Sequence, residues 1–176
     1  MPKLEKEKLE KIKRREIQFK DLFHLDAKQV AALLVTGHNL CKQGRLQDAK
    51  RIYEGVAVLD GRNPYVHAVL GSIYQREENY EAAIMRYNMA LTLFPDDVTS
   101  LLNRGEICIK FGLFEHAAAD LKKVIALDTS KKSPTGNRAR MLAALIRDAL
   151  TLAKEKGLDA VVAEKKRIDQ QIGKRN

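Results

Sequence analysis

The side chains in this sequence that could bind a metal ion or act as nucleophiles are few and scattered. They are four histidines and two cysteines: His24, His38, His67, His116, Cys41 and Cys108. Their spacing matches no metal-ligand pattern. The sequence also has no glycine-rich phosphate-binding loop and no nucleophile-elbow motif. We therefore expect no catalytic residue, no metal ion, no cofactor and no small-molecule substrate, and we predict that the protein is not an enzyme.

The elements that carry these side chains repeat at a period of 34 residues. Three glycines fall in register, as do three alanines and three further sets of large residues. The five sets are Gly37/Gly71/Gly105, Ala49/Ala83/Ala117, Leu46/Tyr80/Phe114, Tyr53/Tyr87/Leu121 and Leu59/Leu93/Leu127. A 34-residue period is typical of helix–turn–helix tetratricopeptide arrays. The small residues let two helices approach closely, and the large residues fill the space around them.

This register divides the chain into an array and its flanks. We predict an all-α fold with three tetratricopeptide repeats in a short right-handed superhelix, because one helical hairpin cannot bury its apolar face alone. The repeats occupy 26–131 as copies 30–63, 64–97 and 98–131. An N-terminal basic helical arm spans 1–25, a loop and C-terminal capping helix span 132–157, and a basic helix or tail spans 158–176.

Local signals refine these boundaries. Asp26 is a predicted N-cap for a helix from Ala27 to Lys42. Residues at the turns inside the three copies tolerate left-handed backbone geometry, and these are Gly44, Asn79 and Gly112. A polar loop is expected over 129–137. The capping helix is then predicted from an apolar face at helical spacing that comprises Leu142, Leu145, Ile146, Ala149, Leu152 and Ala153. Gly157 ends this helix, and Asp159 caps a final one.

Charge is concentrated in the flanks of the array. The chain has a formal net charge of +9. Residues 1–24 hold 8 basic and 5 acidic residues (+3), residues 131–176 hold 12 and 5 (+7), and residues 25–130 hold 12 and 13 (−1). Near-neutral repeats argue against a nucleic-acid groove along the array. The sequence contains neither an apolar run long enough to span a membrane nor an N-terminal apolar signal. A cytoplasmic protein with two free thiols is expected.

A peptide-binding groove can be predicted from the period, because the first helices of stacked hairpins line the concave face. Positions on these helices that face neither the core nor the outer surface are more apolar than a solvated face. They are Leu34, Val35, His38, Tyr65, Ala68, Val69, Ser72, Arg76, Leu102, Asn103 and Glu106. This set predicts an apolar groove for an extended or helical peptide. Contact with the protein's own N-terminal arm is the alternative explanation.

One kind of peptide partner is disfavoured. Tetratricopeptide co-chaperones that hold the C-termini of large heat-shock proteins clamp a carboxylate with cationic and amide side chains. The corresponding positions here are Leu34, His38, Val69, Thr99 and Asn103. None of these residues is a lysine or arginine that could pair with a carboxylate.

The layout resembles a narrower family, the class II chaperones of type III secretion. The resemblance rests on the helical arm, the three repeats, the run GRLQDAKRIYEGVAVLD at 44–60 and the run GEICIKFGLFEHAAADL at 105–121. It covers about residues 26–130. The resemblance implies a bacterial cytoplasmic chaperone that holds an extended segment of a hydrophobic translocator in its groove, often as a dimer through its N-terminal region.

A second hypothesis is a structural scaffold. The basic flanks would then anchor the protein to an acidic surface, such as a membrane headgroup or a nucleic acid. Binding through the flanks would fall steeply with salt and would require residues 157–176. Binding in the groove would depend on neither.

Overall fold

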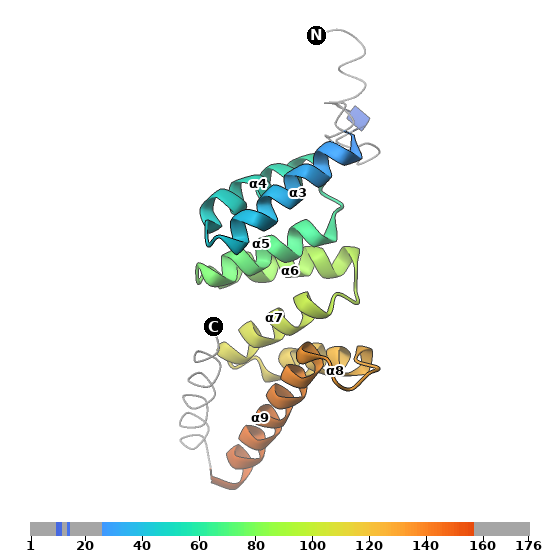
Figure 1. Cartoon of the computed structure of the whole chain (residues 1–176). Helices are drawn as coiled ribbons and strands as arrows, with labels where there is room; N and C mark the ends of the chain where they lie inside the picture. Colours follow the sequence, from blue (N-terminus) through green and yellow to red (C-terminus); the bar gives the residue numbers. More distant parts are fainter. Residues whose placement is uncertain (1–9, 12–13, 15–25, 157–176) are drawn as a thin grey trace. The chain divides into compact units, whose positions relative to one another are not determined.

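The computed structural model describes residues 10–11, 14 and 26–156 (Figure 1). The described residues form helices joined by short turns, without a strand. They belong to two compact units, which we describe separately: the first unit ends at Pro95 and the second begins at Asp96. Most of the predicted arm, the predicted helix after Asp159 and the basic tail lie outside the described residues.

Seven helices account for the array and its cap. They are α3 (Ala27–Lys42), α4 (Leu46–Leu59), α5 (Pro64–Arg76), α6 (Tyr80–Leu93), α7 (Val98–Lys110), α8 (Phe114–Leu127) and α9 (Pro134–Lys156). The first unit contains α3 to α6 and the second contains α7 to α9. Within the units, α3 packs on α4, α5 on α6, α7 on α8 and α8 on α9. The all-α fold of paired helices is therefore confirmed.

Side-chain caps begin several of these helices. Asp26 caps α3 as predicted, and it forms a reciprocal capping box with Gln29. Asn63 and Asp97 accept hydrogen bonds from backbone N–H groups in the first turns of α5 and α7. These caps satisfy donors that a helix N-terminus leaves without an intrahelical partner.

The turn inside the middle repeat differs from the prediction. Gly44 and Gly112 have φ values of +75° and +74°, but the left-handed residue in the turn of the middle repeat is Glu78, with φ of +58°. Asn79 has φ of −83° and caps α6 by accepting a hydrogen bond from Ala82 N. The assignment of Asn79 to the left-handed position was therefore wrong by one residue. The 34-residue register places Glu78, not Asn79, in line with the two glycines.

In the first unit, tyrosine rings pack on glycines across each hairpin. A Cβ atom at Gly37 would lie 2.8 Å from the Tyr53 ring, and one at Gly71 would lie 2.6 Å from the Tyr87 ring. Both rings are fully buried. The hydroxyl of Tyr87 donates a hydrogen bond to Gln75 Oε1 at 2.8 Å. The register of glycines and tyrosines thus reflects direct contact between the two helices of a hairpin.

A polar cluster links α4 to α5 within the first unit. Lys50 Nζ lies 2.7 Å from a Glu77 oxygen and 4.3 Å from the centre of the Tyr74 ring. Tyr74 donates a hydrogen bond to Glu54 Oε1 at 2.6 Å. The hydrogen bond to Glu77 raises the pKa of Lys50, and the hydrogen bond to Glu54 raises the pKa of Tyr74. These contacts bridge the first two repeats.

In the second unit, a leucine and an ion pair replace the tyrosine contact. A Cβ atom at Gly105 would lie 3.5 Å from the nearest Leu121 carbon, which is ordinary van der Waals contact. Beside it, Arg104 donates two hydrogen bonds to Asp120, at 2.8 and 2.7 Å. This bidentate pairing raises the pKa of Arg104.

The capping helix α9 begins earlier than predicted. Residues 134–137 were expected to belong to a polar loop, but the helix begins at Pro134. Ser133 Oγ accepts a hydrogen bond from Gly136 N at 3.0 Å, and proline is favoured in the first turn because it lacks an N–H donor. The missed signal was the Ser-Pro pair. Among the side chains of the predicted apolar face that the structure describes, Leu142, Ile146 and Ala149 are buried.

Candidate peptide-binding face

Eight of the predicted groove residues lie on α3 and α5 in the first unit, and none of them is fully buried. We call this set the first-helix face: Leu34, Val35, His38, Tyr65, Ala68, Val69, Ser72 and Arg76. Val35 and Tyr65 are large apolar side chains with 59% and 45% of their surface exposed. Leu34 and Val69 are half-buried against the core. The face therefore combines accessible apolar groups with a packed apolar floor.

Tyr53 of α4 joins the two helices of this face. Its hydroxyl donates a hydrogen bond to the carbonyl oxygen of Leu34 at 3.3 Å and lies 3.5 Å from the Tyr65 hydroxyl. Because Tyr53 has a single O–H, the Tyr65 hydroxyl is left as the donor between the two phenols. The rings meet edge to face, with centroids 6.2 Å apart. Burial is the main cause that raises the pKa of Tyr53 well above its usual range, and the bond with Tyr65 adds to it.

A half-buried thiol lies further along α3. Burial raises the pKa of Cys41, while the charge of Arg76 on α5 opposes that shift. Cys108 in the second unit is buried, and burial also raises its pKa. Both cysteines are free, as the sequence predicted. A raised pKa keeps both thiols protonated and poorly nucleophilic.

The third repeat contributes less open surface than the register predicted. Asn103 is half-buried, whereas Leu102 and Glu106 are buried. The carboxylate of Glu106 forms an ion pair with Arg138 of α9. The register could not reveal this contact, because α9 lies outside the repeats. The accessible part of the candidate site is therefore the first-helix face.

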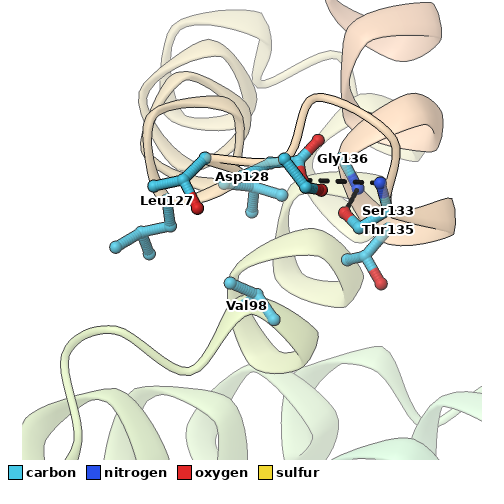
Figure 2. Close-up of a pocket in the computed structure, with 9 residues that line it drawn as sticks. Val98, Leu127, Asp128, Ser133, Thr135 and Gly136 are labelled. Carbon is cyan, nitrogen blue, oxygen red and sulfur yellow. Dashed lines mark hydrogen bonds between the residues drawn. The ribbon is translucent and has the colours of Figure 1, made fainter.

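A pocket of about 250 Å³ lies in the second unit and was not anticipated (Figure 2). It is lined by Val98, Val124 and Leu127, by the loop after α8 and by the start of α9. Figure 2 shows the chain of hydrogen bonds from Asp128 through Ser133 to Gly136.

Three polar side chains of this pocket, those of Asp128, Ser130 and Ser133, are already engaged within the protein. Asp128 accepts hydrogen bonds from Arg140 at 2.7 Å and from Ser130 at 2.9 Å. The bond from Arg140 is the main cause that lowers the pKa of Asp128. A Cβ atom at Gly136 would collide with this carboxylate. The pocket is thus part of the structural joint between the third repeat and α9.

Other kinds of site find no support in the part of the chain that the structure describes. Among those residues, no three histidines, cysteines or acids come together as metal ligands. A search of the same residues finds no helix long and apolar enough to cross a membrane.

Comparison with known protein families supports the repeat architecture. The sequence matches the family model of the tetratricopeptide repeat over residues 70–147. With the three helix pairs and their 34-residue register, this match defines the class: the chain has the tetratricopeptide repeat fold. No protein with a curated description matches the chain in sequence.

Among solved structures, the chain resembles type III secretion proteins. The translocator chaperone SycD of Yersinia enterocolitica has a TM-score of 0.64 and 17% identity over 73% of this chain and 97% of its own. A type III secretion complex from Aeromonas hydrophila has a TM-score of 0.73 and 17% identity, covering 82% and 97%. PcrH, solved with the chaperone-binding region of PopD, has a TM-score of 0.64 and 20% identity, covering 70% and 95%. At this identity the likeness concerns the fold.

Proposed function

We propose that this protein is a non-enzymatic chaperone that holds a segment of a partner polypeptide on its first-helix face, and that the partner is a hydrophobic secreted protein of the type III translocator kind. The observation that carries the proposal is the exposure of Val35 and Tyr65 on consecutive first helices. The likeness to SycD and to PcrH, which was solved with a segment of a partner, supports the same mode of binding.

The chemistry of the face favours apolar anchors over charged ones. Apart from the Tyr65 phenol, the ionisable side chains among its eight residues are His38 and Arg76. The same face carries the aliphatic residues Leu34, Val35 and Val69. The exposed parts of Val35 and Tyr65 amount to roughly 200 Å², which corresponds to about 5 kcal/mol on burial. Association costs consume part of this energy, so micromolar affinity is expected once a partner adds a few further contacts.

Val35→Asp is the direct test. The side chain is exposed, so a charge there leaves the helical fold intact but opposes the burial of an apolar anchor. Val58→Asp is the matched control, because Val58 is also exposed (64%) but lies on α4. Tagged wild-type and variant proteins would be used to co-purify partners from the native host and the partners identified by mass spectrometry.

We expect a hydrophobic secreted protein with the wild type and with Val58→Asp, and its loss with Val35→Asp. Equal recovery with all three proteins would contradict the proposal. If that recovery were also abolished by salt and by deletion of residues 157–176, the scaffold hypothesis would replace it.

A further inference from the structure

Four exposed apolar side chains follow one another along α6 and its C-cap in the first unit. They are Met85, Met89, Leu93 and Phe94, with 61%, 44%, 39% and 52% of their surface exposed. The first three recur at a spacing of four residues, so they share one side of the helix over a length of about 12 Å. We call these four residues the methionine stripe.

The repeat itself does not require this stripe. In the 34-residue register, the residues that correspond to Met85 and Met89 are Arg51 and Gly55 in the first copy. In the third copy they are Ala119 and Lys123. Arg51, Gly55 and Ala119 are exposed, and Lys123 pairs with Asp96. Two repeats thus fold with polar or small residues at these positions. The two methionines are a property of the middle repeat, and packing within a hairpin does not explain them.

The size of the stripe limits what it can bind. With about 200 Å² for each fully exposed large side chain, its exposed area is roughly 400 Å², the scale of a functional apolar patch. A stable dimer buries about 800 Å² on each partner. The stripe therefore offers about half the surface that a symmetric contact between two copies of this chain would require. A single short element of a partner fits the available area.

The backbone of α6 favours a helix as that element. Its N–H and C=O groups are used within the helix, so an extended chain would find no backbone partners there. A helix satisfies its own backbone and can place apolar residues between the side chains of the stripe. Methionine suits such a contact because its unbranched, polarisable side chain adapts to different partners.

Acidic side chains lie at one end of the stripe. Glu81 precedes Met85 by one helical turn, and Glu78 lies just before α6. Both glutamates are exposed. A lysine or arginine at one end of the bound helix would meet this negative charge. The acids that follow Phe94 in the sequence, Asp96 and Asp97, are already engaged within the second unit, by Lys123 and by the backbone of α7. The charge of Glu78 and Glu81 therefore gives the partner a direction along α6.

We propose that the methionine stripe is a second binding site, and that its ligand is an amphipathic helix of a partner protein with apolar residues at i, i+4 and i+8 and with basic residues at the end that meets Glu78 and Glu81. This site lies on α6, whereas the first-helix face lies on α3 and α5. The two sites can therefore be tested separately.

The sequence makes a direct measurement possible, because the full chain has four methionines: Met1, Met85, Met89 and Met141. In protein labelled with ¹³C at the methionine methyl groups, each methyl gives its own NMR signal. The probe is a synthetic 15-residue helical peptide with leucines at the stated spacing and two lysines at one end. We expect the signals of Met85 and Met89 to shift on titration, while that of Met141 on α9 stays in place.

Variants then test whether the stripe provides the affinity. Replacing both residues (Met85→Gln and Met89→Gln) should weaken binding of the probe at least tenfold by fluorescence anisotropy. Val58→Gln on α4 is the matched control and should leave the affinity unchanged, because Val58 is also exposed (64%) and lies outside both proposed sites. Val35→Gln on α3 tests whether the probe binds the first-helix face instead. Replacing both acids (Glu78→Gln and Glu81→Gln) should weaken binding a few-fold and reduce its dependence on salt. Circular dichroism verifies that each variant keeps its helices.

Three outcomes would overturn the proposal. The first is an equal affinity for the probe in the wild type and in the folded methionine double variant. The second is a shift of the Met141 signal as large as those of Met85 and Met89, which would indicate non-specific adhesion. The third is a loss of binding in Val35→Gln alone, which would place the peptide on the first-helix face.

Discussion

The two units pack the glycine of the repeat register in different ways. In the first unit, the rings of Tyr53 and Tyr87 lie so close to Gly37 and Gly71 that a methyl group would not fit. In the second unit, Leu121 leaves room for a methyl group at Gly105, and the Arg104–Asp120 pair lies beside it. Glycine in the same register is thus a steric requirement in one unit and not in the other.

The sharpest test of this difference is an alanine at each glycine. Gly71→Ala should destabilise the protein by about 2 to 3 kcal/mol, because a Cβ atom at 2.6 Å from the buried Tyr87 ring overpacks the hairpin. Gly105→Ala should be neutral or stabilising by up to about 1 kcal/mol, since alanine is the better helix former. Urea unfolding measures both. Equal destabilisation at the two positions would show that the contacts do not differ.

The ion pair of the second unit gives the next largest effect. Arg104→Leu should destabilise the protein by about 2 kcal/mol, because it leaves the largely buried carboxylate of Asp120 unpaired. This figure is lower than for a fully buried pair, since the Arg104 side chain is 26% exposed. The double variant Arg104→Leu with Asp120→Leu should recover most of the loss. A double variant as unstable as the single one would show that packing, not charge, dominates here.

Acid should weaken the second unit through Asp128. Its pKa is lowered in the folded state, chiefly by the hydrogen bond from Arg140. The stabilisation is therefore complete above the ordinary carboxyl pKa of about 3.9 and is lost as the pH falls through the lower folded value. Thermal unfolding between pH 5 and pH 2 measures this loss. Asp128→Asn should be less stable than the wild type at pH 5, and the difference should shrink toward pH 2; a constant difference would contradict the assignment.

The smallest expected effect lies at the turn of the middle repeat. Glu78 adopts a left-handed conformation with φ of +58°, which glycine adopts without steric cost. Glu78→Gly should therefore stabilise the protein by about 0.5 to 1 kcal/mol, and Gly44→Ala should destabilise it by about 1 kcal/mol. Chemical unfolding of the two variants provides the measurement. A destabilised Glu78→Gly would indicate that backbone freedom in the unfolded chain outweighs the relief of strain.

The sequence predicted the helix pairs well because their signal is repeated. Three copies of the glycine, alanine and large-residue columns defined the period, and Asp26 marked the start of α3. The single-copy features were harder. Ser133-Pro134 was assigned to a loop, because nothing in the repeats indicated that the pair begins α9.

The repeat register could not predict which residues of the candidate site are buried, because some of them are covered by a helix outside the repeats. Val35 and Tyr65 are exposed at positions that the period assigned to a groove. Glu106 occupies a comparable position, but it is buried and paired with Arg138, which lies outside the array. The 34-residue period only compares the repeats with one another. It therefore cannot predict which repeat residues are buried by α9, which has no counterpart in the repeats.

Two of the arginines of α9 also limit how the array can grow. Arg138 pairs with Glu106 of α7, and Arg140 pairs with Asp128 at the end of α8. A repeat protein with a bare last hairpin offers an apolar end on which another hairpin or another molecule can stack. Here the acids at that end are already neutralised by a helix of different sequence. Helix α9 thus closes this end of the array with two ion pairs as well as with its buried apolar side chains. A further repeat stacked in its place would have to supply partners for Glu106 and Asp128.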